Sequence, residues 1–281
     1  KEKESLILQL SIAKEAISCR TVENNSSIVL KDEFPLIKHI SCPENIGFAG
    51  GNNIGLYFAT GEFVFFVNND TEVTPKLVTQ LVAHLQTHPK CGIACPKIKY
   101  FYKPDTIQYA GAVGLHPLTS RSFDVGYLPN GAAMMVPMKL ITKIGQMSEM
   151  YFLYYEELDW AARFKQQGFE IHYVGTAEIY HKESVSTGKN SPFKTFYLYR
   201  NRFLYIRRNY KGLKWLIAST FFILVSSMVH IFKHRLKNEK EHAIAIWRAL
   251  IWNFSESHHK EPKNHSSTFI DNIKIDLIPT P

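Results

Sequence analysis

A carboxylate and two amides follow an apolar run of the chain, in the segment EFVFFVNND. The run 62–67 is nearly all apolar and aromatic, which is typical of a buried strand. Ligands of open α/β sheets bind beyond the carboxyl ends of the strands, where we expect Asn68, Asn69 and Asp70. A carboxylate there can hold a divalent cation against a diphosphate, because magnesium and manganese prefer oxygen ligands. The alternative is that Asp70 only caps a turn, as Asp and Asn often do.

A glycine-rich segment, NIGFAGGNNIG, precedes this strand. We expect 45–53 to form a loop that leads into a helix ending near Ala59. Gly47, Gly50 and Gly51 permit close approach of the backbone, and the helix offers unpaired N–H groups to an anion. The segment is neither a P-loop nor a correctly spaced dinucleotide fingerprint, so the glycines alone are weak evidence for a phosphate site.

Three acids stand at the start of a helix predicted from about Glu156 to Gln167, ended by a glycine. Glu156 and Asp159 are three residues apart and share a face, and Asp159 could pair with Arg163. Glu157 points elsewhere, so one carboxylate could accept a proton from an incoming hydroxyl while another orients it. The alternative is an acidic first turn that the helix dipole favours.

His181 follows the apolar run 177–180. A lone histidine at a strand end is more often a packed or surface residue than a ligand. Its place behind Asp70 and the acidic helix nevertheless makes a metal-binding role a hypothesis worth testing.

The composition is that of an ordinary globular protein: 281 residues, 45% hydrophobic and 21% charged, with a net charge of +8. This excludes a mostly disordered, collagen-like or disulfide-stapled chain. Cys91 and Cys95, in CGIAC, lack the spacing of paired metal ligands, and reduced thiols of a cytosolic protein are the better interpretation. The basic residues form no long run and no zinc-finger or RNP-like motif appears, so we expect no nucleic acid partner.

Strands alternate with helices in the first hundred residues, which predicts a mainly parallel sheet in an α/β domain. The predicted helices are 2–17, 75–85 and 193–210, beside those already named. The further predicted strands are 19–22, 36–40, 93–98, 170–174 and 177–181, with a strand-rich stretch at 106–138.

An apolar stretch, 215–232, contains no Asp, Glu, Lys or Arg and is about long enough to cross a bilayer core. Basic residues flank it on both sides, whereas a spanning helix usually shows a bias toward one side. We therefore favour a helix lying in or dipping into an anionic cytoplasmic interface, with a spanning helix and a buried core helix as alternatives. A second helix near 239–252 could pack against it, and the tail after about Ser255 is polar.

Together these segments resemble family 2 glycosyltransferases of the GT-A fold, particularly the rhamnosyltransferase-like branch. NIGFAGGNNIGLYFATGEFVFFVNNDTEV is similar to the donor-site signature of that branch, and GAAMMVP to its mid-domain acceptor-side strand. YYEELDWAARFKQQGF resembles its acidic helix and AEIYHKESVS its terminal histidine segment. The resemblance covers roughly 19–210 and implies a GT-A domain at 1–210, a helical membrane-associated region at 211–255 and a polar tail at 256–281.

The resemblance implies an inverting, metal-dependent transfer from a nucleoside-diphosphate sugar, dTDP-rhamnose-like or a UDP-sugar. The acceptor would be a hydroxyl of a glycan or a lipid-linked glycan in surface polysaccharide synthesis, at the inner face of the cell membrane. By the same resemblance Asp70 and His181 bind Mg²⁺ or Mn²⁺, with Asn68 opening a reduced Asn-x-Asp motif. Glu157 matches the general base, and Glu156 and Asp159 are the next catalytic candidates.

The resemblance also implies a donor site. Glu23 and Asn24 match a pair that contacts the nucleoside. The other donor-binding candidates are Asn45, Gly47, Gly51, Asn52, Asn68, Asn69 and Gly131.

The chain departs from the family pattern in three places. Glu157 and Glu23 stand where the family usually has Asp, and the β-strand that normally opens the domain has no counterpart before the helix at 2–17. These departures leave a non-catalytic nucleotide-sugar or glycan-binding relative as the alternative. A nucleotidyltransferase would carry a glycine-rich loop with a basic residue at its first strand, which the sequence lacks.

Overall fold

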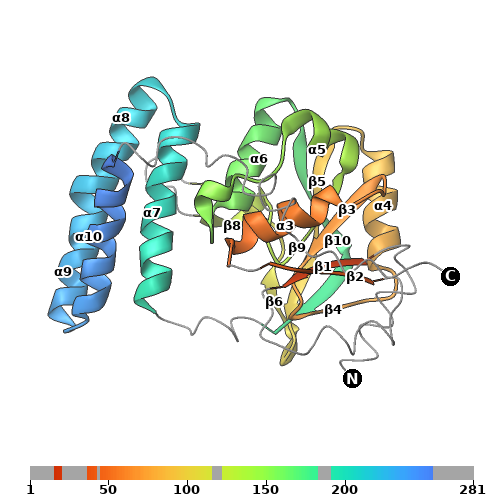
Figure 1. The fold of residues 1–281 in the computed structure, drawn as a ribbon, viewed down its shortest axis with the longest axis horizontal. Helices are drawn as coiled ribbons and strands as arrows, with labels where there is room; N and C mark the ends of the chain where they lie inside the picture. Colours follow the sequence, from red (N-terminus) through yellow and green to blue (C-terminus); the bar gives the residue numbers. More distant parts are fainter. Residues whose placement is uncertain (1–15, 21–36, 43–44, 116–121, 183–190, 256–281) are drawn as a thin grey trace.

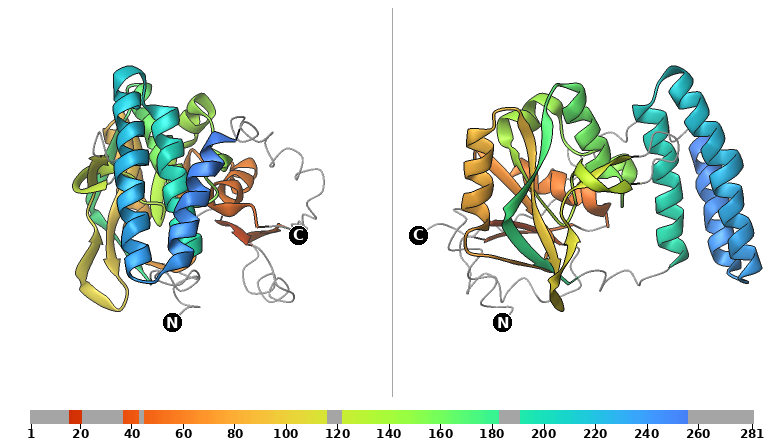
Figure 2. Two further views of the ribbon diagram at one scale, coloured as in Figure 1. Left: turned by 90° about the vertical axis from the view of Figure 1, so that its left-hand side faces the viewer. Right: turned by 180° about the vertical axis from the view of Figure 1, so that it is seen from behind.

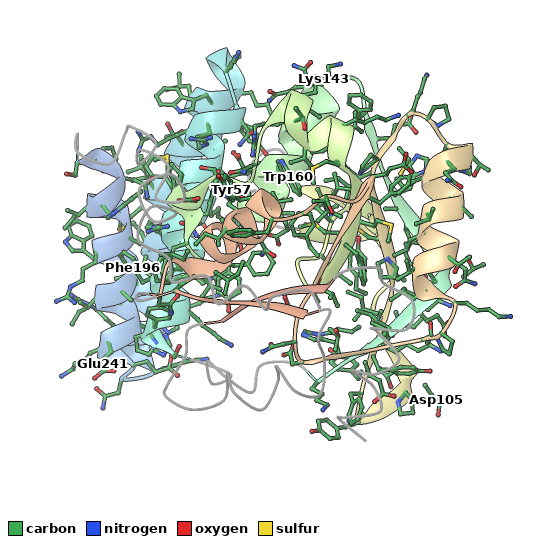
Figure 3. The ribbon with its side chains drawn as sticks, turned by 45° about the vertical axis from the view of Figure 1, so that its right-hand side comes forward. Tyr57, Asp105, Lys143, Trp160, Phe196 and Glu241 are labelled. Carbon is green, nitrogen blue, oxygen red and sulfur yellow. The ribbon has the colours of Figure 1, made fainter. Side chains whose placement is uncertain are left out.

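The computed structural model describes residues 16–20, 37–42, 45–115, 122–182 and 191–255. These residues form an α/β domain and, beside it, a group of helices that stands apart from the sheet (Figure 1). Figure 2 shows the two parts from the side and from behind, with the helical group along one flank of the domain. Trp160 lies in the domain, whereas Phe196 and Glu241 lie on the helical group (Figure 3).

The domain is built on a six-stranded sheet with the order β3-β9-β5-β10-β4, and β6 is paired to β5. Its strands are β3 (Phe63–Val67), β4 (Thr71–Val73), β5 (Cys91–Tyr100), β6 (Lys103–Tyr109), β9 (Ala133–Pro137) and β10 (Glu170–His181). A hairpin of β7 (Ala112–Leu115) and β8 (Ser122–Leu128) precedes β9.

The sheet is mixed, so the prediction of a mainly parallel sheet was wrong. Only β5 and β10 pair in parallel, whereas β9 is antiparallel to both β3 and β5, and β4 is antiparallel to β10. β5 is also antiparallel to β6, which follows it directly in a hairpin without a crossover helix. The two strands predicted at 170–174 and 177–181 are one strand, β10, with an irregularity between Val174 and Glu178.

Two further strands, β1 (Ala16–Arg20) and β2 (Ile37–Ser41), form a parallel pair of their own. No described strand joins this pair to the six-stranded sheet. Most of the helix predicted at 2–17 lies outside the described residues, and Ala16 and Ile17 begin β1 instead of ending a helix.

The helices of the domain are α3 (Gly47–Tyr57), α4 (Leu77–Thr87), α5 (Met138–Ile144) and α6 (Glu156–Gln166), with a short 3₁₀ turn, η1 (Glu149–Tyr151). The glycine-rich segment predicted as a loop is therefore the start of a helix. The Asn45 side chain accepts a hydrogen bond from the Gly47 N–H, 3.0 Å, at the residue where that helix begins. Gly168 ends α6 with φ +82°, as its position predicted.

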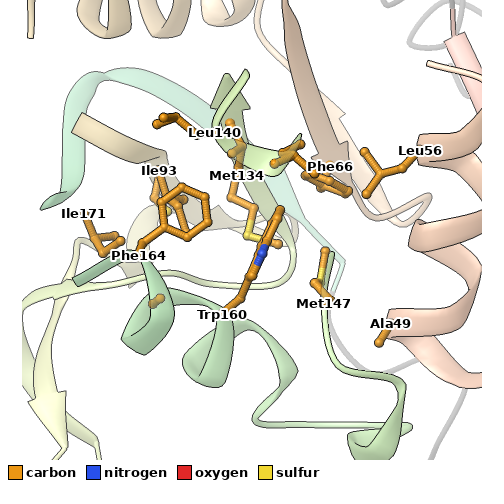
Figure 4. Close-up of a cluster of buried hydrophobic side chains, with 14 residues drawn as sticks. Ala49, Leu56, Phe66, Ile93, Met134, Leu140, Met147, Trp160, Phe164 and Ile171 are labelled. Atoms are coloured by element: carbon orange, nitrogen blue, oxygen red, sulfur yellow. The ribbon is translucent and has the colours of Figure 1, made fainter. Parts of the chain in front are cut away.

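The two faces of the sheet bury separate apolar clusters. α3, α5 and α6 cover one face, where Phe66 of β3 meets Trp160 of α6 edge-to-face at 5.5 Å (Figure 4). α4 covers the other face with Leu77, Leu81 and Leu85, which are spaced for one side of a helix and are all buried. The first cluster fixes the position of β3 relative to the acidic helix α6, because side chains of both elements pack in it.

The helical group consists of α7 (Pro192–Asn209), a long rod and α10 (Lys240–Phe254). The rod is continuous from α8 (Gly212–Thr220) through a π-helical turn, η2 (Phe221–Ser227), to α9 (Met228–Leu236). Phe222 at this turn stacks on Phe203 of α7, with ring centroids 5.7 Å apart. The same cluster includes Met150, Tyr151 and Tyr155, so the helical group packs on the segment that precedes α6.

Candidate functional site

The short strand β4 brings Asp70 beside His181. Thr71 pairs with His181 at the end of β10, and the Lys182 N–H donates to the Asp70 carbonyl at 2.9 Å. The Asp70 Oδ1 and His181 Nε2 atoms are 3.2 Å apart. The two predicted metal ligands, 111 residues apart in sequence, are therefore neighbours.

The hydrogen bonds around His181 leave its second ring nitrogen facing Asp70. Nδ1 lies 2.9 Å from Oε1 of Gln108, and an amide oxygen can only accept, so Nδ1 carries the proton in the neutral ring. Nε2 then presents a lone pair to the Asp70 carboxylate. When His181 is protonated, its Nε2–H donates to Asp70 instead, and this hydrogen bond is the largest cause that lowers the pKa of the carboxyl, while burial opposes it.

This pair fits a divalent cation. Asp70 Oδ1 is buried without a hydrogen-bond partner among the described residues, and the nearby Nε2 has a free lone pair. Adjacent ligands of an octahedral ion, each at about 2.1 Å, lie about 3.0 Å apart, close to the 3.2 Å observed. The donor set of one carboxylate oxygen and one imidazole suits Mn²⁺ and is acceptable for Mg²⁺.

The first two acids of α6 have unequal surroundings. Glu156 is buried and its Oε2 has no hydrogen-bond partner among the described residues, whereas Glu157 is partly exposed. Burial raises the pKa of Glu156 well above its ordinary value, and the neighbouring Glu157 adds to this. Burial also raises the pKa of Glu157, to about 7. A carboxylate with such a pKa is suited to accept a proton near neutral pH.

Asp159 is bonded to side chains of several other segments. Its Oδ1 accepts hydrogen bonds from Tyr151, Arg208 and Asn209, at 3.0, 3.2 and 2.9 Å, and its side chain is fully buried. The predicted pair with Arg163 is present at 3.4 Å. These contacts hold the Asp159 carboxylate in place, and its catalytic role stays a prediction that ranks behind Glu157.

The segment leading into α6 is strained. Phe152, Tyr154 and Tyr155 have φ angles of 62°, 69° and 75°, in the left-handed region that large side chains avoid. Such residues persist only where their surroundings hold them, and they concentrate at functional sites. This segment, 152–155, immediately precedes Glu156 and Glu157, so its backbone conformation determines where the two carboxylates lie.

Two buried residues of α7 hold the strained segment. The Asn201 amide donates to the carbonyls of Tyr151, Leu153 and Tyr154, at 2.8, 2.6 and 2.8 Å. The neighbouring Arg200 donates to the Tyr151 carbonyl at 2.5 Å. Neither residue was predicted to have a role, because the only signal in the sequence is a polar pair inside an aromatic helix, which also fits a solvent-exposed face.

The glycine-rich segment docks on the same strained segment. The Phe48 N–H donates to the Phe152 carbonyl at 2.8 Å. Gly47 has φ +77°, and a Cβ added there would lie 2.3 Å from that carbonyl oxygen, so the position requires glycine. A Cβ at Gly131 would be 3.4 Å from the Phe48 ring, which places Gly131 beside α3 as well.

The remaining donor-binding candidates lie around these elements. Asn52 donates to the Phe48 carbonyl within α3, which also contains Gly51. The backbone of Asn68 bonds to Ala132 next to Gly131, and Asn69 is exposed. Glu23 and Asn24 lie outside the described residues.

The fold is similar to those of solved glycosyltransferases. Staphylococcus aureus TarS in complex with UDP matches with a TM-score of 0.55 and 16% identity, over 84% of this chain and 71% of that one. The mannosyltransferase PcManGT from Pyrobaculum calidifontis, in complex with GDP-Man and Mn²⁺, matches with a TM-score of 0.52 and 13% identity, over 85% and 76%. The fold is therefore the GT-A fold of glycosyltransferases.

Sequence comparison agrees with this class. Residues 20–139 match the family model of Glycosyl transferase family 2. The dTDP-rhamnosyl transferase RfbF of Shigella flexneri is 23% identical over 80% of this chain and 83% of its own length. The hexosyltransferase Agl10 of low-salt glycan biosynthesis in Haloferax volcanii is 26% identical over 65% of each.

A third relative is the N-acetylglucosaminyl-diphospho-decaprenol L-rhamnosyltransferase of Mycobacterium tuberculosis, 24% identical over 41% of this chain and 39% of its own length. Residues 20–139 thus resemble family 2 glycosyltransferases, and these relatives support the rhamnosyltransferase-like branch that the motifs also resemble. The family match and the named transferases among the relatives indicate a transferase.

Proposed function

We propose that the chain transfers a sugar, with inversion, from a nucleoside-diphosphate donor to a hydroxyl of a glycan or lipid-linked acceptor. The observation that carries this proposal is the pairing of Asp70 with His181, which fits a cation beside a diphosphate. Solved neighbours that hold UDP, or GDP-Man and Mn²⁺, support a nucleotide-sugar donor and a divalent metal. The names of the relatives favour dTDP-rhamnose as the donor, in surface glycan synthesis.

Asp70 and His181 would hold Mg²⁺ or Mn²⁺. Bound there, the ion supplies positive charge that stabilises the diphosphate as it leaves the sugar. Asn68, Asn69 and Gly131 border the donor on the sheet side. The N-terminus of α3 adds the positive end of a helix dipole, which favours a negatively charged ligand.

Glu157 is the general base of this proposal. Its carboxylate takes the proton of the acceptor hydroxyl, whose oxygen attacks the anomeric carbon as the bond from that carbon to the diphosphate breaks. One displacement with attack opposite to the leaving group inverts the anomeric centre. Glu156 is the next candidate for the base; it is buried, and burial raises its pKa well above the ordinary value.

Titration calorimetry with dTDP and UDP, with and without Mn²⁺, tests the metal assignment. We expect nucleotide binding that requires Mn²⁺ in the wild-type chain and falls at least tenfold in Asp70→Asn. Glu72→Gln is the matched control, because Glu72 is a partly exposed acid two residues away on β4. Metal-dependent binding that is unchanged in Asp70→Asn would remove Asp70 from the site.

We also propose that the helical group attaches the enzyme to the cytoplasmic face of a membrane. The rod Gly212–Leu236 is a helix that is both long enough and apolar enough to cross a bilayer. Its most apolar window has a mean hydropathy of 1.9, and only 28% of that window is buried. This exposure argues against a core helix of a soluble domain. The exposed apolar side chains are Leu213, Trp215, Leu216, Ile217, Leu224, Val225, Val229, Phe232 and Leu236 of the rod, with Ile244, Trp247, Ile251 and Phe254 of α10.

An interfacial position explains both the apolar surface and the charges around it. α10 has only 15 residues and exposes Glu241 and Arg248, so it is too short and too polar to cross beside the rod. We expect sedimentation with anionic phosphatidylglycerol vesicles, and weaker sedimentation for Leu224→Glu. Tyr102→Glu, an equally exposed site on the α/β domain, should sediment like the wild type. Equal sedimentation of all three proteins would contradict the proposal.

A further inference from the structure

Two histidines and a cysteine from three different elements meet at the end of the sheet opposite to His181. They are His84 near the end of α4, Cys91 at the start of β5 and His172 near the start of β10. One ligand atom from each lies within 4.8 Å of the other two. His172 and His181 are nine residues apart on the same strand, up to about 30 Å, so this cluster is remote from the Asp70 pair.

A bulge in β5 creates the cluster. Glu170 pairs with Cys91 but Ile171 pairs with Ile93, so one residue of β5 is left over at Gly92. Cys91 consequently packs with the α4 face, while Cys95 packs on the opposite face. The cysteines of CGIAC therefore do not form a pair, and Cys91 turns toward the histidines instead.

The hydrogen bonds of His172 leave one of its nitrogens available as a ligand. Its Nε2 lies 2.9 Å from a carboxylate oxygen of Glu170 and must donate a proton to it. Its Nδ1 therefore has the lone pair and accepts a hydrogen bond from Nε2 of His84 at 2.9 Å. A metal ion between the two atoms would take the place of that proton, with His84 protonated at Nδ1. A carboxylate that orients the far nitrogen of an imidazole is the usual outer partner of a metal-binding histidine.

The second imidazole, His84, is held in place by a third. The His88 ring stacks on His84 with the ring centroids 4.0 Å apart, which fixes the orientation of His84. His84 Nε2 consequently stays next to Nδ1 of His172.

We propose that His84, Cys91 and His172 bind a zinc ion that fastens α4 to β5 and β10. Nitrogen and thiolate donors are those zinc prefers, and tetrahedral ligands at its usual bond lengths lie about 3.3 to 3.6 Å apart. The three atoms are within 4.8 Å of one another without an ion, so side-chain movements of about 1 to 1.5 Å complete the site. His172 is 20% exposed, which leaves the fourth position to water.

Binding at this site forms a zinc–sulfur bond and releases the thiol proton of Cys91 to solvent. The donors differ in kind from the oxygen-rich set expected for the catalytic ion, so the two sites select different metals. The zinc site is structural, because it joins three elements beneath α4 and lies far from the donor.

Cobalt titration of the chelator-treated full chain tests this inference, because Co²⁺ reports its ligands by absorption. We expect one equivalent to give tetrahedral bands and a thiolate-to-cobalt charge-transfer band, both removed by added Zn²⁺. Cys91→Ser should abolish the charge-transfer band, and His172→Gln should weaken Co²⁺ and Zn²⁺ binding at least tenfold. Because His172 is partly exposed, this second variant is informative even if Cys91→Ser folds poorly.

Three controls separate the site from other metal binding. Asp70→Asn should keep the charge-transfer band, since the catalytic pair holds no sulfur. Cys95→Ser should keep it as well, and so should His234→Gln, a histidine paired with Glu239 on the helical group. A folded wild-type chain without a thiolate band, or a band that persists in Cys91→Ser, would overturn the assignment.

Discussion

Removing the Asn201 side chain should loosen the strained segment that leads into α6. The fully buried Asn201 amide donates to three carbonyls of that segment. In Asn201→Ala the Tyr151 carbonyl keeps Arg200 as a donor, but the carbonyls of Leu153 and Tyr154 lose the Asn201 amide. A buried carbonyl left without its donor costs about 1 to 3 kcal/mol, so we expect a total loss of about 3 kcal/mol.

The loss of stability in Asn201→Ala should be concentrated in the strained segment. Left-handed backbone at a non-glycine residue stores about 1 to 3 kcal/mol, which the segment can release once the amide is gone. Amide hydrogen exchange in 150–156 should therefore accelerate more than elsewhere, and urea unfolding should give the overall loss. A misplaced Glu157 should also slow transfer, with the pH dependence retained.

Asn253→Ala is the matched control for this prediction. Asn253 is equally buried and donates to the carbonyls of Arg200 and Ala249, both inside helices. Its loss should lower the free energy of unfolding by about 1 kcal/mol without selective exchange in the strained segment. If both variants accelerate exchange there equally, or Asn201→Ala costs less than about 1 kcal/mol, Asn201 does not hold the segment.

Two further predictions concern a glycine and a carboxyl. Gly47→Ala forces a Cβ to within 2.3 Å of the Phe152 carbonyl oxygen and should cost more than about 3 kcal/mol in urea unfolding. Gly168→Ala, at φ +82° with open space around it, should cost only about 1 kcal/mol, and equal losses would refute the steric argument. The rate of transfer should rise as the pH passes through about 7, because Glu157 must lose its proton to act, and Glu157→Gln should abolish transfer while sparing donor binding. The folded chain holds this proton more tightly than the unfolded chain does, so the free energy of unfolding should fall as pH rises from 4.5 to about 7, and less so in Glu157→Gln.

Periodicity and caps in the sequence predicted the individual elements well, but not how they pair. The apolar run at β3, the helix α6 and its end at Gly168 lie where the patterns placed them. Strand direction is set by connections and not by periodicity, so the antiparallel placement of β9 could not be deduced. The start of α3 at Gly47 was missed because glycine disfavours helix, while docking on the Phe152 carbonyl overrides that preference.

Side-chain roles were predictable only where the partners are local. The ion pair of Asp159 with Arg163 was predicted from helical spacing. The other hydrogen-bond donors to that carboxylate come from other segments and were not predicted: Tyr151, Arg208 and Asn209. Cys91 shows the same limit, because a bulge in β5, invisible in CGIAC, decides which face it joins. Asp70 and His181 were linked through the resemblance, since nothing in their spacing brings them together.

α7 connects the apolar surface of the helical group to the acidic residues of α6. On one side its Arg200 and Asn201 bond to the strained segment, and on the other its Phe203 and Leu204 share an apolar cluster with Leu250 of α10. The predicted division of the chain after 210 would separate α7 from the helices that bury its other face. Since α7 is braced by α10 and in turn holds the segment before Glu157, the helical group is a structural support of the candidate base. On the membrane attachment proposed above, an acceptor held at the membrane would meet a base whose position depends on the same helices.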